Sequence, residues 1–558
     1  MKDIATSTPL PTPRQMLAVL VLAAITYVHG IGSLHVMRNG DEDIYAQIAR
    51  CTAASGRWLP LRSDMPEMVN TKPPLLFWQG ILSTGWGRNW SLAALRWPSL
   101  AWTFLTAGLV GLLAWRIGGR DVAAGLLASA VYLGFLSTYR YGRPFLTNPP
   151  ETFWTTLCFF VMLWWRPRSF SSRFLVPSIL GVVVGIVLLT KSFAQLLPIG
   201  LVLTAWHLHE ARCDDGSPRW ATLLTRSLPG LAWTALIALG MFSLWFMLDP
   251  EPAAIWREFV VHENLGKMKA GRPNYLLAML WGRMNIWGYG LTWFLNAGVL
   301  ALPLLGTFIL AWQHRRDAGR EERLLWIAVA VWFVVFLVPT QRSGRYLLPV
   351  MPMLAILTAI HWRQLLPSAL TGSLAIAGVV LGGLAWVSVA LVREVGGGVL
   401  PAAHWPILAG GLGIVALGLF DPRRRGAASV AGALAVSLAV SSCLQAFDPP
   451  AGAYAPEVAA RAAGRVVWVP RTFRASEEHQ RMVLPGADVR GFSSDAEGPA
   501  AGDLQTVMQP LRAPPPARAI GSRLDLNGRW AEADFARVFT GGIAEVVFRR
   551  EWLVVVDE

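Results

Sequence analysis

The sequence predicts an all-α, polytopic membrane protein followed by a small soluble α/β domain, and three observations support this prediction. Of the 558 residues, 54% are hydrophobic and 15% are charged, whereas soluble domains have roughly 25% charged residues. The apolar residues come in blocks of roughly 17–25, the length that an α-helix needs to cross a bilayer. After about residue 447 these blocks stop and the composition becomes that of a soluble chain.

Thirteen apolar blocks qualify as membrane spans, because backbone amides in lipid must be paired within their own segment. The first block has no small-residue cleavage site after it, so we expect it to be retained. The blocks lie near residues 16–36, 93–115, 121–139, 151–165, 174–190, 193–209, 227–248, 287–312, 324–340, 345–361, 367–392, 401–420 and 427–446.

The net charge of +14 is better explained by membrane topology than by a nucleic-acid partner. The Arg-rich connections 115–120, 166–173, 313–323 and 421–426 fall on one side if the spans alternate. Short loops rich in Arg and Lys stay in the cytoplasm, and such residues also attract anionic lipid phosphates. We therefore expect a multi-pass membrane protein whose N-terminus is cytoplasmic and whose C-terminal tail is outside.

The first outer loop, residues 37–92, is expected to hold two helices. "IYAQIARCTAAS" has helical spacing of apolar residues and is followed by Gly56 as a stop signal. "TKPPLLFWQGILSTGW" begins with prolines and is rich in Trp and Phe, which suits a helix lying in the membrane interface.

The C-terminal region, residues 447–558, is expected to be a separate domain from the membrane domain, residues 1–446. "EVAARAAG" reads as a helix, "RVVWVP" as a strand and "EVVFRREWLVVVDE" as a strand hairpin. It has no evident catalytic constellation, so we interpret it as an accessory domain. The four cysteines lie far apart and predict neither a disulfide framework nor a zinc ribbon.

The acidic cluster "DED" at 41–43 directly follows the first span. Its position at the membrane boundary calls for an explanation. By itself it could be a solvated cap, because acids favour a helix N-terminus. The surrounding pattern favours a functional role: an Asp-Glu-x-x-Tyr motif, a Gly-x-Trp, a Lys-Pro-Pro and an Arg at the start of the second span. These places hold Asp41, Glu42, Tyr45, Gly56, Trp58, Lys72, Pro73, Pro74 and Arg96.

Three further motifs follow in order: "RPFLTNPPETFW" at 143–154, "FVVHENLGKM" at 259–268 and "RSGRYLLPVMPMLAIL" at 342–357. Together the four motifs resemble those of family-39 membrane glycosyltransferases, the GT-C enzymes that include protein O-mannosyltransferases and the aminoarabinose transferase of lipid A. The span count and the outer tail particularly resemble the aminoarabinose branch. The resemblance covers roughly residues 16–360 and implies a GT-C fold.

The resemblance implies transfer of a sugar from a polyprenyl-phosphate donor to an envelope lipid, glycan or protein at the periplasmic face of a bacterial inner membrane. Membrane lipids are expected as further partners. A carboxylate acts as general base on the acceptor hydroxyl; Asp41 is our candidate, with Glu42 behind it. Fixed cations stabilise the leaving phosphate; the motifs nominate Lys72 and Arg345, and Arg96 less directly. The resemblance also assigns substrate contacts to Tyr45, Asn148, Glu151, His262, Glu263 and Tyr346.

Each nominated cation has a plain alternative. Lys72 could be a snorkelling interfacial residue, and Arg345 could be a membrane-end anchor. His262 alone would be a structural hydrogen-bonding group, whereas beside Glu263 a role in donor or metal binding is favoured. His207, His209 and Glu210 resemble a metal cluster but fall on the cytoplasmic side, so we interpret them as a helix end.

Two residues depart from the family pattern. The family has Asp where this chain has Asn148, and Asn can be neither a base nor a charged metal ligand. The family's Glu before Lys-Pro-Pro is replaced by Thr71; in the aminoarabinose branch that Glu and the loop His can bind a metal. No cofactor is therefore assigned, a divalent metal ion is left open, and we expect the donor or acceptor sugar to differ from the best-known cases.

Two other functions compete with glycosyl transfer. A transporter or flippase for the lipid-linked sugar would need related halves and charged or broken helices near mid-bilayer, and the sequence has no internal repeat. A catalytically inactive carrier-binding homologue would fit Asn148 but not the presence of Asp41, Glu42, Lys72 and Arg345.

Overall fold

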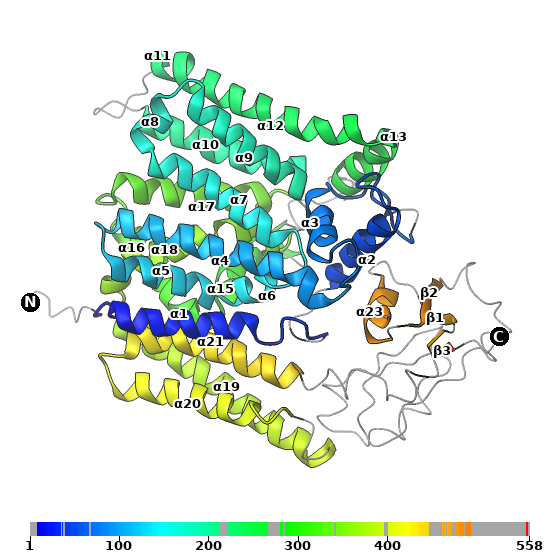
Figure 1. Cartoon of the computed structure of the whole chain (residues 1–558). Coiled ribbons are helices and arrows are strands. Elements are labelled where there is room, and N and C mark those ends of the chain that lie inside the picture. The colour runs from blue at the N-terminus through cyan, green and yellow to red at the C-terminus, as the bar shows by residue number, and fades with distance from the viewer. Residues whose placement is uncertain are drawn as a thin grey trace, which may run out of the picture.

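The structure is a computed structural model, in which the membrane domain is a bundle of helices capped at one end by the first outer loop (Figure 1). It describes residues 8–34, 36, 40–65, 68–211, 220–265, 279–282, 285–339, 342–395, 400–445, 460, 463–464, 466–470, 475–484, 486–492 and 554–555.

Every expected apolar block corresponds to a helix or a helix pair. The main helices are α1 (Pro13–Val28), α4 (Leu92–Ile117), α5 (Val122–Gly134), α6 (Leu136–Gly142), α7 (Asn148–Trp164), α9 (Leu175–Thr190), α10 (Leu196–Glu210), α12 (Leu228–Leu248), α15 (Ile286–Ala297), α16 (Ala301–Gln313), α17 (Arg320–Leu337), α18 (Met351–Ile360), α19 (Pro367–Val395), α20 (His404–Phe420) and α21 (Arg425–Leu444). Shorter helices are α8 (Arg166–Ser171), α11 (Trp220–Thr222), α13 (Pro252–Ala254), the 3₁₀ turns η2 (Phe193–Gln195), η6 (Gly298–Leu300), η7 (Gly344–Val350) and η8 (Trp362–Gln364), and the π-helical η3 (Leu223–Ser227) and η4 (Ile255–Leu265).

Five helices of the described part are long and apolar enough to cross a membrane. A sixth span results if α5 and α6, which are bent by 65°, count as one. The block expected at 121–139 is thus two helices that meet at Phe135. Shorter apolar helices make up most of the others, so the count of thirteen stays a prediction.

Side-chain caps fix where several of these helices begin. Thr12 and Gln15 form a capping box at the start of α1, which satisfies backbone N–H groups that a helix leaves unpaired. Ser91 accepts from the Ala94 N–H at the start of α4, and Asp121 accepts from the Ala123 N–H at the start of α5.

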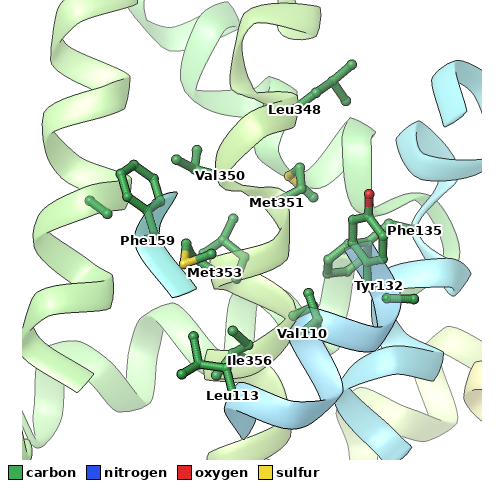
Figure 2. Packing of buried hydrophobic residues seen from close by; sticks show 14 of the residues in the cluster. Val110, Leu113, Tyr132, Phe135, Phe159, Leu348, Val350, Met351, Met353 and Ile356 are labelled. Atoms are coloured by element: carbon green, nitrogen blue, oxygen red, sulfur yellow. The ribbon is translucent and has the colours of Figure 1, made fainter. Parts of the chain in front are cut away.

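The core is centred on η7 and α18, whose side chains are surrounded by α4, α5 and α7 (Figure 2). Val350, Met353 and Ile356 are fully buried beside Val110 and Phe159. This packing ties the segment that carries Arg345 and Tyr346 firmly to the bundle centre.

Small residues let α9 and α12 pack closely, as the "GVVVG" pattern at 181–185 indicates. A Cβ on Gly181 would lie 2.7 Å from Ile237, and one on Gly185 would lie 2.8 Å from the Met241 sulfur. These glycines therefore serve helix packing.

The two expected loop helices are present as α2 (Gly40–Ala54) and α3 (Leu75–Ser83), at the end of the bundle opposite the N-terminus (Figure 1). Gly56 has a φ of +69° just after α2, which explains why a glycine ends this helix. Asn70 fixes the intervening loop, because it accepts from the Leu61 N–H and donates to Asp249.

The described part of the C-terminal region forms a β-α-β unit. Strand β1 (Val466–Pro470) pairs in parallel with β2 (Asp488–Phe492) and antiparallel with β3 (Val554–Val555), and α23 (Ser476–Val483) connects β1 to β2. The strand expected at "RVVWVP" is confirmed. The expected helix at 457–464 and the hairpin at 545–558 lie almost wholly outside the described residues, and the separate domain stays a prediction.

Helix α23 docks on α2 through a set of polar contacts that we call the docking cluster: Gln47, Arg50, Asp64, Glu477, Glu478 and Arg481. Gln47 donates to Glu477 at 2.7 Å, and the Arg50 Nε lies 3.1 Å from both oxygens of Glu478. Asp64 lies 2.8 Å from Arg50 and 3.1 Å from Arg481. Both glutamates are fully buried, so the C-terminal region is held to the first outer loop by paired charges.

Candidate active site

Asp41, Glu42 and Asp43 occupy the first turn of α2, where acids are favoured by the helix dipole. The first outer loop begins where α1 ends, and α2 lies across the end of the bundle (Figure 1). The helix begins at Gly40, before Asp41, and Glu42 and Asp43 are buried, so the three acids do not form a solvated cap. Asp41 and Glu42 instead make long-range contacts.

Glu42 is held in a buried ion pair with Arg96 of α4. The Arg96 Nε and Nη2 atoms each donate to a Glu42 oxygen at 2.7 Å, and the two side chains are 2% and 1% exposed. Glu42 also accepts from the Phe145 N–H at 2.8 Å. Arg96 Nη1 donates to the carbonyls of Ile31 and Ser33. All three guanidinium nitrogens of Arg96 therefore bind protein acceptors, and the pair holds α2, α4 and the segment that carries Phe145 together.

Asp41 makes a different ion pair, with Arg345 at the start of η7. The Arg345 Nη1 donates to Asp41 at 2.5 Å, and the two side chains are 24% and 29% exposed. Arg345 Nη2 donates to the Asn148 side-chain oxygen at 3.0 Å, and its guanidinium carbon lies 5.3 Å from the centre of the Tyr141 ring. Asp41, Asn148 and Arg345 come from the first, second and fourth sequence motifs, so three motifs that are distant in the chain meet at one place.

A second polar group continues from Asn148 into the bundle. Asn148 lies 3.4 Å from Glu151, which accepts from the Lys191 Nζ at 2.6 Å and from Gln195 at 2.8 Å. Glu151 is 1% exposed and Lys191 is 19% exposed. The Lys191 Nζ also lies 5.9 Å from the Tyr346 ring centre.

Lys191 and Gln195 are functional candidates that the motifs missed. Lys191 stands between α9 and η2, where a single lysine interrupts two apolar helices. Charged residues inside spans usually mark functional sites, and this signal could have singled out Lys191 in the sequence.

Tyr45 and Lys72 are the other two nominated residues of the first outer loop. Tyr45 is buried and packs edge-on against Phe77 of α3, with ring centres 5.9 Å apart. Lys72 is half-buried in the segment that leads into α3.

A small cavity of about 20 Å³ adjoins Asn148, which is room for about one water molecule. Hydroxyl and amide groups make up its polar lining, which consists of Thr103, Tyr132, Ser137, Thr138, Tyr141, Asn148 and Thr152. The neighbourhood of Asn148 is therefore polar on the side that faces the bundle.

His262 lies apart from these groups in the described contacts. It sits on η4 with 64% of its side chain exposed, and its Nδ1 lies 2.9 Å from Glu258. The Glu263 side chain lies outside the described residues. His207, His209 and Glu210 form the last turn of α10, and Glu210 pairs with Arg166, which agrees with a helix end.

The residue at the position of the family's metal ligand does not supply a carboxylate. Thr71 is buried, and its hydroxyl donates to the Met68 carbonyl at 3.3 Å. Within the described ranges, no three His, Cys, Asp or Glu side chains converge. We therefore assign no chemical step to a metal ion.

Comparison with known proteins supports the resemblance drawn from the motifs. Residues 15–248 match the family model of dolichyl-phosphate-mannose-protein mannosyltransferases. The chain is 27% identical over 351 residues to undecaprenyl phosphate-alpha-4-amino-4-deoxy-L-arabinose arabinosyl transferase 2 of Pseudomonas fluorescens. It is 25% identical over 333 residues to the corresponding transferase 1 of Sodalis glossinidius. These alignments cover 61% and 58% of this chain, but only 58% and 54% of the relatives' own lengths.

Solved structures confirm the fold. ArnT from Cupriavidus metallidurans, bound to undecaprenyl phosphate, matches with a TM-score of 0.58 over 84% of this chain and 85% of that one, at 21% identity. The apo form of the same protein gives a TM-score of 0.57 at 19% identity. The expected GT-C architecture, a multi-pass helical membrane protein, is therefore present.

Proposed function

We propose that this chain, which resembles the GT-C membrane glycosyltransferases of family 39 in fold and sequence, transfers a sugar from a polyprenyl-phosphate donor to an envelope acceptor. One observation carries the proposal. Asp41 and Arg345, which are 304 positions apart in the chain, meet at 2.5 Å in a partly exposed site at the end of the bundle. A base and a phosphate-binding cation are the two groups that this reaction needs side by side.

The ion pair suggests how donor binding activates the base. Arg345 can exchange Asp41 for the donor phosphate, because its planar fork binds phosphate in a bidentate manner. Asp41 is then released to take the proton of the acceptor hydroxyl. The acceptor oxygen forms a bond to the anomeric carbon, the bond from that carbon to the phosphate oxygen breaks, and the lipid phosphate leaves with the electron pair. Attack opposite the phosphate inverts the anomeric centre.

Two lysines and several polar side chains take supporting roles in this proposal. Lys72 and Lys191 add positive charge for the phosphate. Six further side chains are proposed to shape the sugar site or to contact the substrate: Tyr45, Asn148, Glu151, His262, Glu263 and Tyr346.

Glu42 and Arg96 receive a different role from the one that the motifs suggest. Their polar atoms bind each other and the surrounding backbone, so neither has a group directed at a substrate. We reassign both as positioning residues that hold α2, and with it Asp41, at the end of α4.

The acceptor is proposed to be lipid A, another envelope glycan or a protein, with lipid A first among those to test because of the aminoarabinose-branch resemblance. Asn148 and Thr71 remove two negative charges relative to the family pattern, which favours a donor or acceptor sugar different from aminoarabinose. The orientation proposed is a cytoplasmic N-terminus with the site and the C-terminal region periplasmic.

The test is transfer of radiolabelled sugar from a panel of undecaprenyl-phosphate donors by purified wild-type and Asp41→Asn protein. We expect transfer by the wild type, loss in Asp41→Asn, and retained donor binding. Asp121→Asn is the matched control, because Asp121 caps α5 away from the site and Asn caps equally well. A wild type that binds donors but transfers to no envelope fraction would favour the carrier-binding or transport functions instead.

A further inference from the structure

A second cavity lies at the end of the bundle opposite Asp41, between α15, α16, α17 and the last turn of α10. Its volume is about 520 Å³ and its walls are mainly apolar. Aromatic rings contact one another along it: the Phe308 and Trp326 ring centres are 5.3 Å apart, and those of Trp293 and Phe333 are 6.0 Å apart. The cavity therefore has the lining of a site for an alkyl chain.

Two arginines stand at the polar end of this cavity. The Arg315 guanidinium lies 4.7 Å from the Trp312 ring centre, and its Nη1 donates to the Trp312 carbonyl. Arg323 donates from Nη2 to the Arg316 carbonyl at 2.7 Å. The buried Nε of Arg323 has no hydrogen-bond acceptor in the described part of the chain. A buried donor without an acceptor is unfavourable, so an oxygen from a ligand is the natural partner.

Nearby carboxylates do not neutralise these arginines. Glu321 binds Arg166 at 2.8 Å, and Glu322 binds His361 at 2.8 Å. Asp317 is exposed in the same connection, and no ion pair joins it to Arg315 or Arg323 among the described contacts. The α16–α17 connection also carries Arg316 and Arg320, so positive charge is in excess where the apolar cavity ends.

We propose that this cavity binds one anionic phospholipid, with an acyl chain against the aromatic walls and the phosphate on Arg315 and Arg323. The cavity is lined by residues of α15, α16, α17, the α16–α17 connection and the last turn of α10, and none of its lining residues is among the donor-site candidates named above. The site is thus separate from the donor site proposed above and does not depend on that proposal. Charge complementarity, the buried Arg323 Nε without an acceptor in the described residues and the mainly apolar lining together favour a lipid phosphate over a free anion.

The test measures lipid retained by the full-length protein. Wild-type protein is reconstituted in nanodiscs of phosphatidylglycerol and phosphatidylcholine, extracted into detergent, and its lipids are counted by native mass spectrometry. We expect about one phosphatidylglycerol per chain, and at least a fivefold loss in Arg315→Gln/Arg323→Gln. Arg316→Gln/Arg320→Gln is the matched control, because it removes the same charge from the same connection without altering the cavity lining.

Two further arms keep the result decisive. Ala311→Trp fills the cavity but leaves both arginines, so it should also reduce retention, and thermal unfolding checks that each variant is folded. Millimolar glycerol phosphate should not displace the lipid. Equal retention by the two arginine double variants, equal retention of phosphatidylcholine, or displacement by glycerol phosphate would each overturn the proposal.

Discussion

Asp41 and Glu42 are adjacent carboxylates, each paired with an arginine, yet the two pairs differ in burial and in the partners around them. Glu42 and Arg96 are almost fully buried, and three further hydrogen bonds to the backbone satisfy them. Asp41 and Arg345 are about a quarter exposed, and their partners include the side chain of Asn148. The contrast indicates that the Glu42–Arg96 pair stays formed, whereas the Asp41–Arg345 pair can separate when a ligand offers better contacts.

The energetics of ion pairs support this distinction. Breaking a buried pair by removing one partner costs about 3–5 kcal/mol, because a charge is left uncompensated in a low dielectric. A solvent-exposed pair contributes about 0–1 kcal/mol, and the Asp41–Arg345 pair, whose side chains are 24% and 29% exposed, falls between the two cases. On the proposed function, exchange of Asp41 for a phosphate should therefore cost less at Arg345 than exchange of Glu42 would cost at Arg96.

The largest loss of activity is expected for Asp41→Asn. Removing a general base lowers turnover about 10²–10⁴-fold, which is about 3–5 kcal/mol of transition-state stabilisation. Thermal unfolding in detergent should change little, because the Asp41 pair is partly exposed. Transfer kinetics and unfolding of the same preparation measure both quantities, and a large loss of stability would remove the distinction between the two pairs.

For Glu42→Gln, in contrast to Asp41→Asn, we expect a large loss of stability. The variant leaves the Arg96 charge buried without a carboxylate, so the free energy of unfolding should fall by about 3 kcal/mol. Glu42→Gln/Arg96→Met should be less destabilised than the sum of the single variants, because both charges leave together. Unfolding titrations of the wild type, Glu42→Gln, Arg96→Met and the double variant form the double-mutant cycle. Additive effects would contradict the interaction between Glu42 and Arg96.

Arg345→Lys tests the open pair with a smaller effect. Lysine keeps the charge but loses the fork, so we expect the donor KM to rise about tenfold, or 1.4 kcal/mol, with stability unchanged. Arg140→Lys is the matched control, because Arg140 also contacts the Tyr141 ring, at 5.2 Å, and is exposed. Equal KM changes in both variants would show that stacking, not phosphate binding, is the role of Arg345.

The smallest expected effect is the pH dependence of the docking of α23 on α2. Burial favours a raised pKa for Asp64, but Arg50 and Arg481 outweigh it and hold the pKa below its usual value. A lowered carboxyl pKa stabilises docking above the usual aspartate pKa of about 3.9, and this stabilisation is lost as pH falls through the lowered value. We expect the distance between spin labels at Ser55 and Arg490 to stay constant from pH 8 to 5 and to lengthen only below about pH 4.

Asp64→Asn is the reference variant for this pH series. The variant should show weaker docking already at neutral pH and a flatter response to acid. A label distance that changes between pH 7 and 5 in the wild type would mean that some other group controls docking.

The sequence was enough to predict a multi-pass helical membrane fold, because apolar length depends on local chain properties. Its motifs also named Asp41, Asn148 and Arg345, which the structure brings together. The sequence named Asp41 as the base with Glu42 behind it, but it could not show that Glu42 faces Arg96 while Asp41 faces Arg345. The bend at Phe135 and the Glu151–Lys191 contact depend on packing between distant helices. Docking of Glu477 and Glu478 on α2 joins positions about 430 residues apart, and no local pattern marks such a contact.

The docking cluster also bears on how the protein is made. Residues of α2 leave the ribosome early, but their partners on α23 follow about 430 positions later, a delay of roughly 20–90 s at 5–20 residues per second. Until then Gln47 and Arg50 lack Glu477 and Glu478. Completion of the outer loop therefore waits for nearly the whole chain to be translated, and a prematurely terminated product would carry every catalytic candidate without the support that fixes their helix.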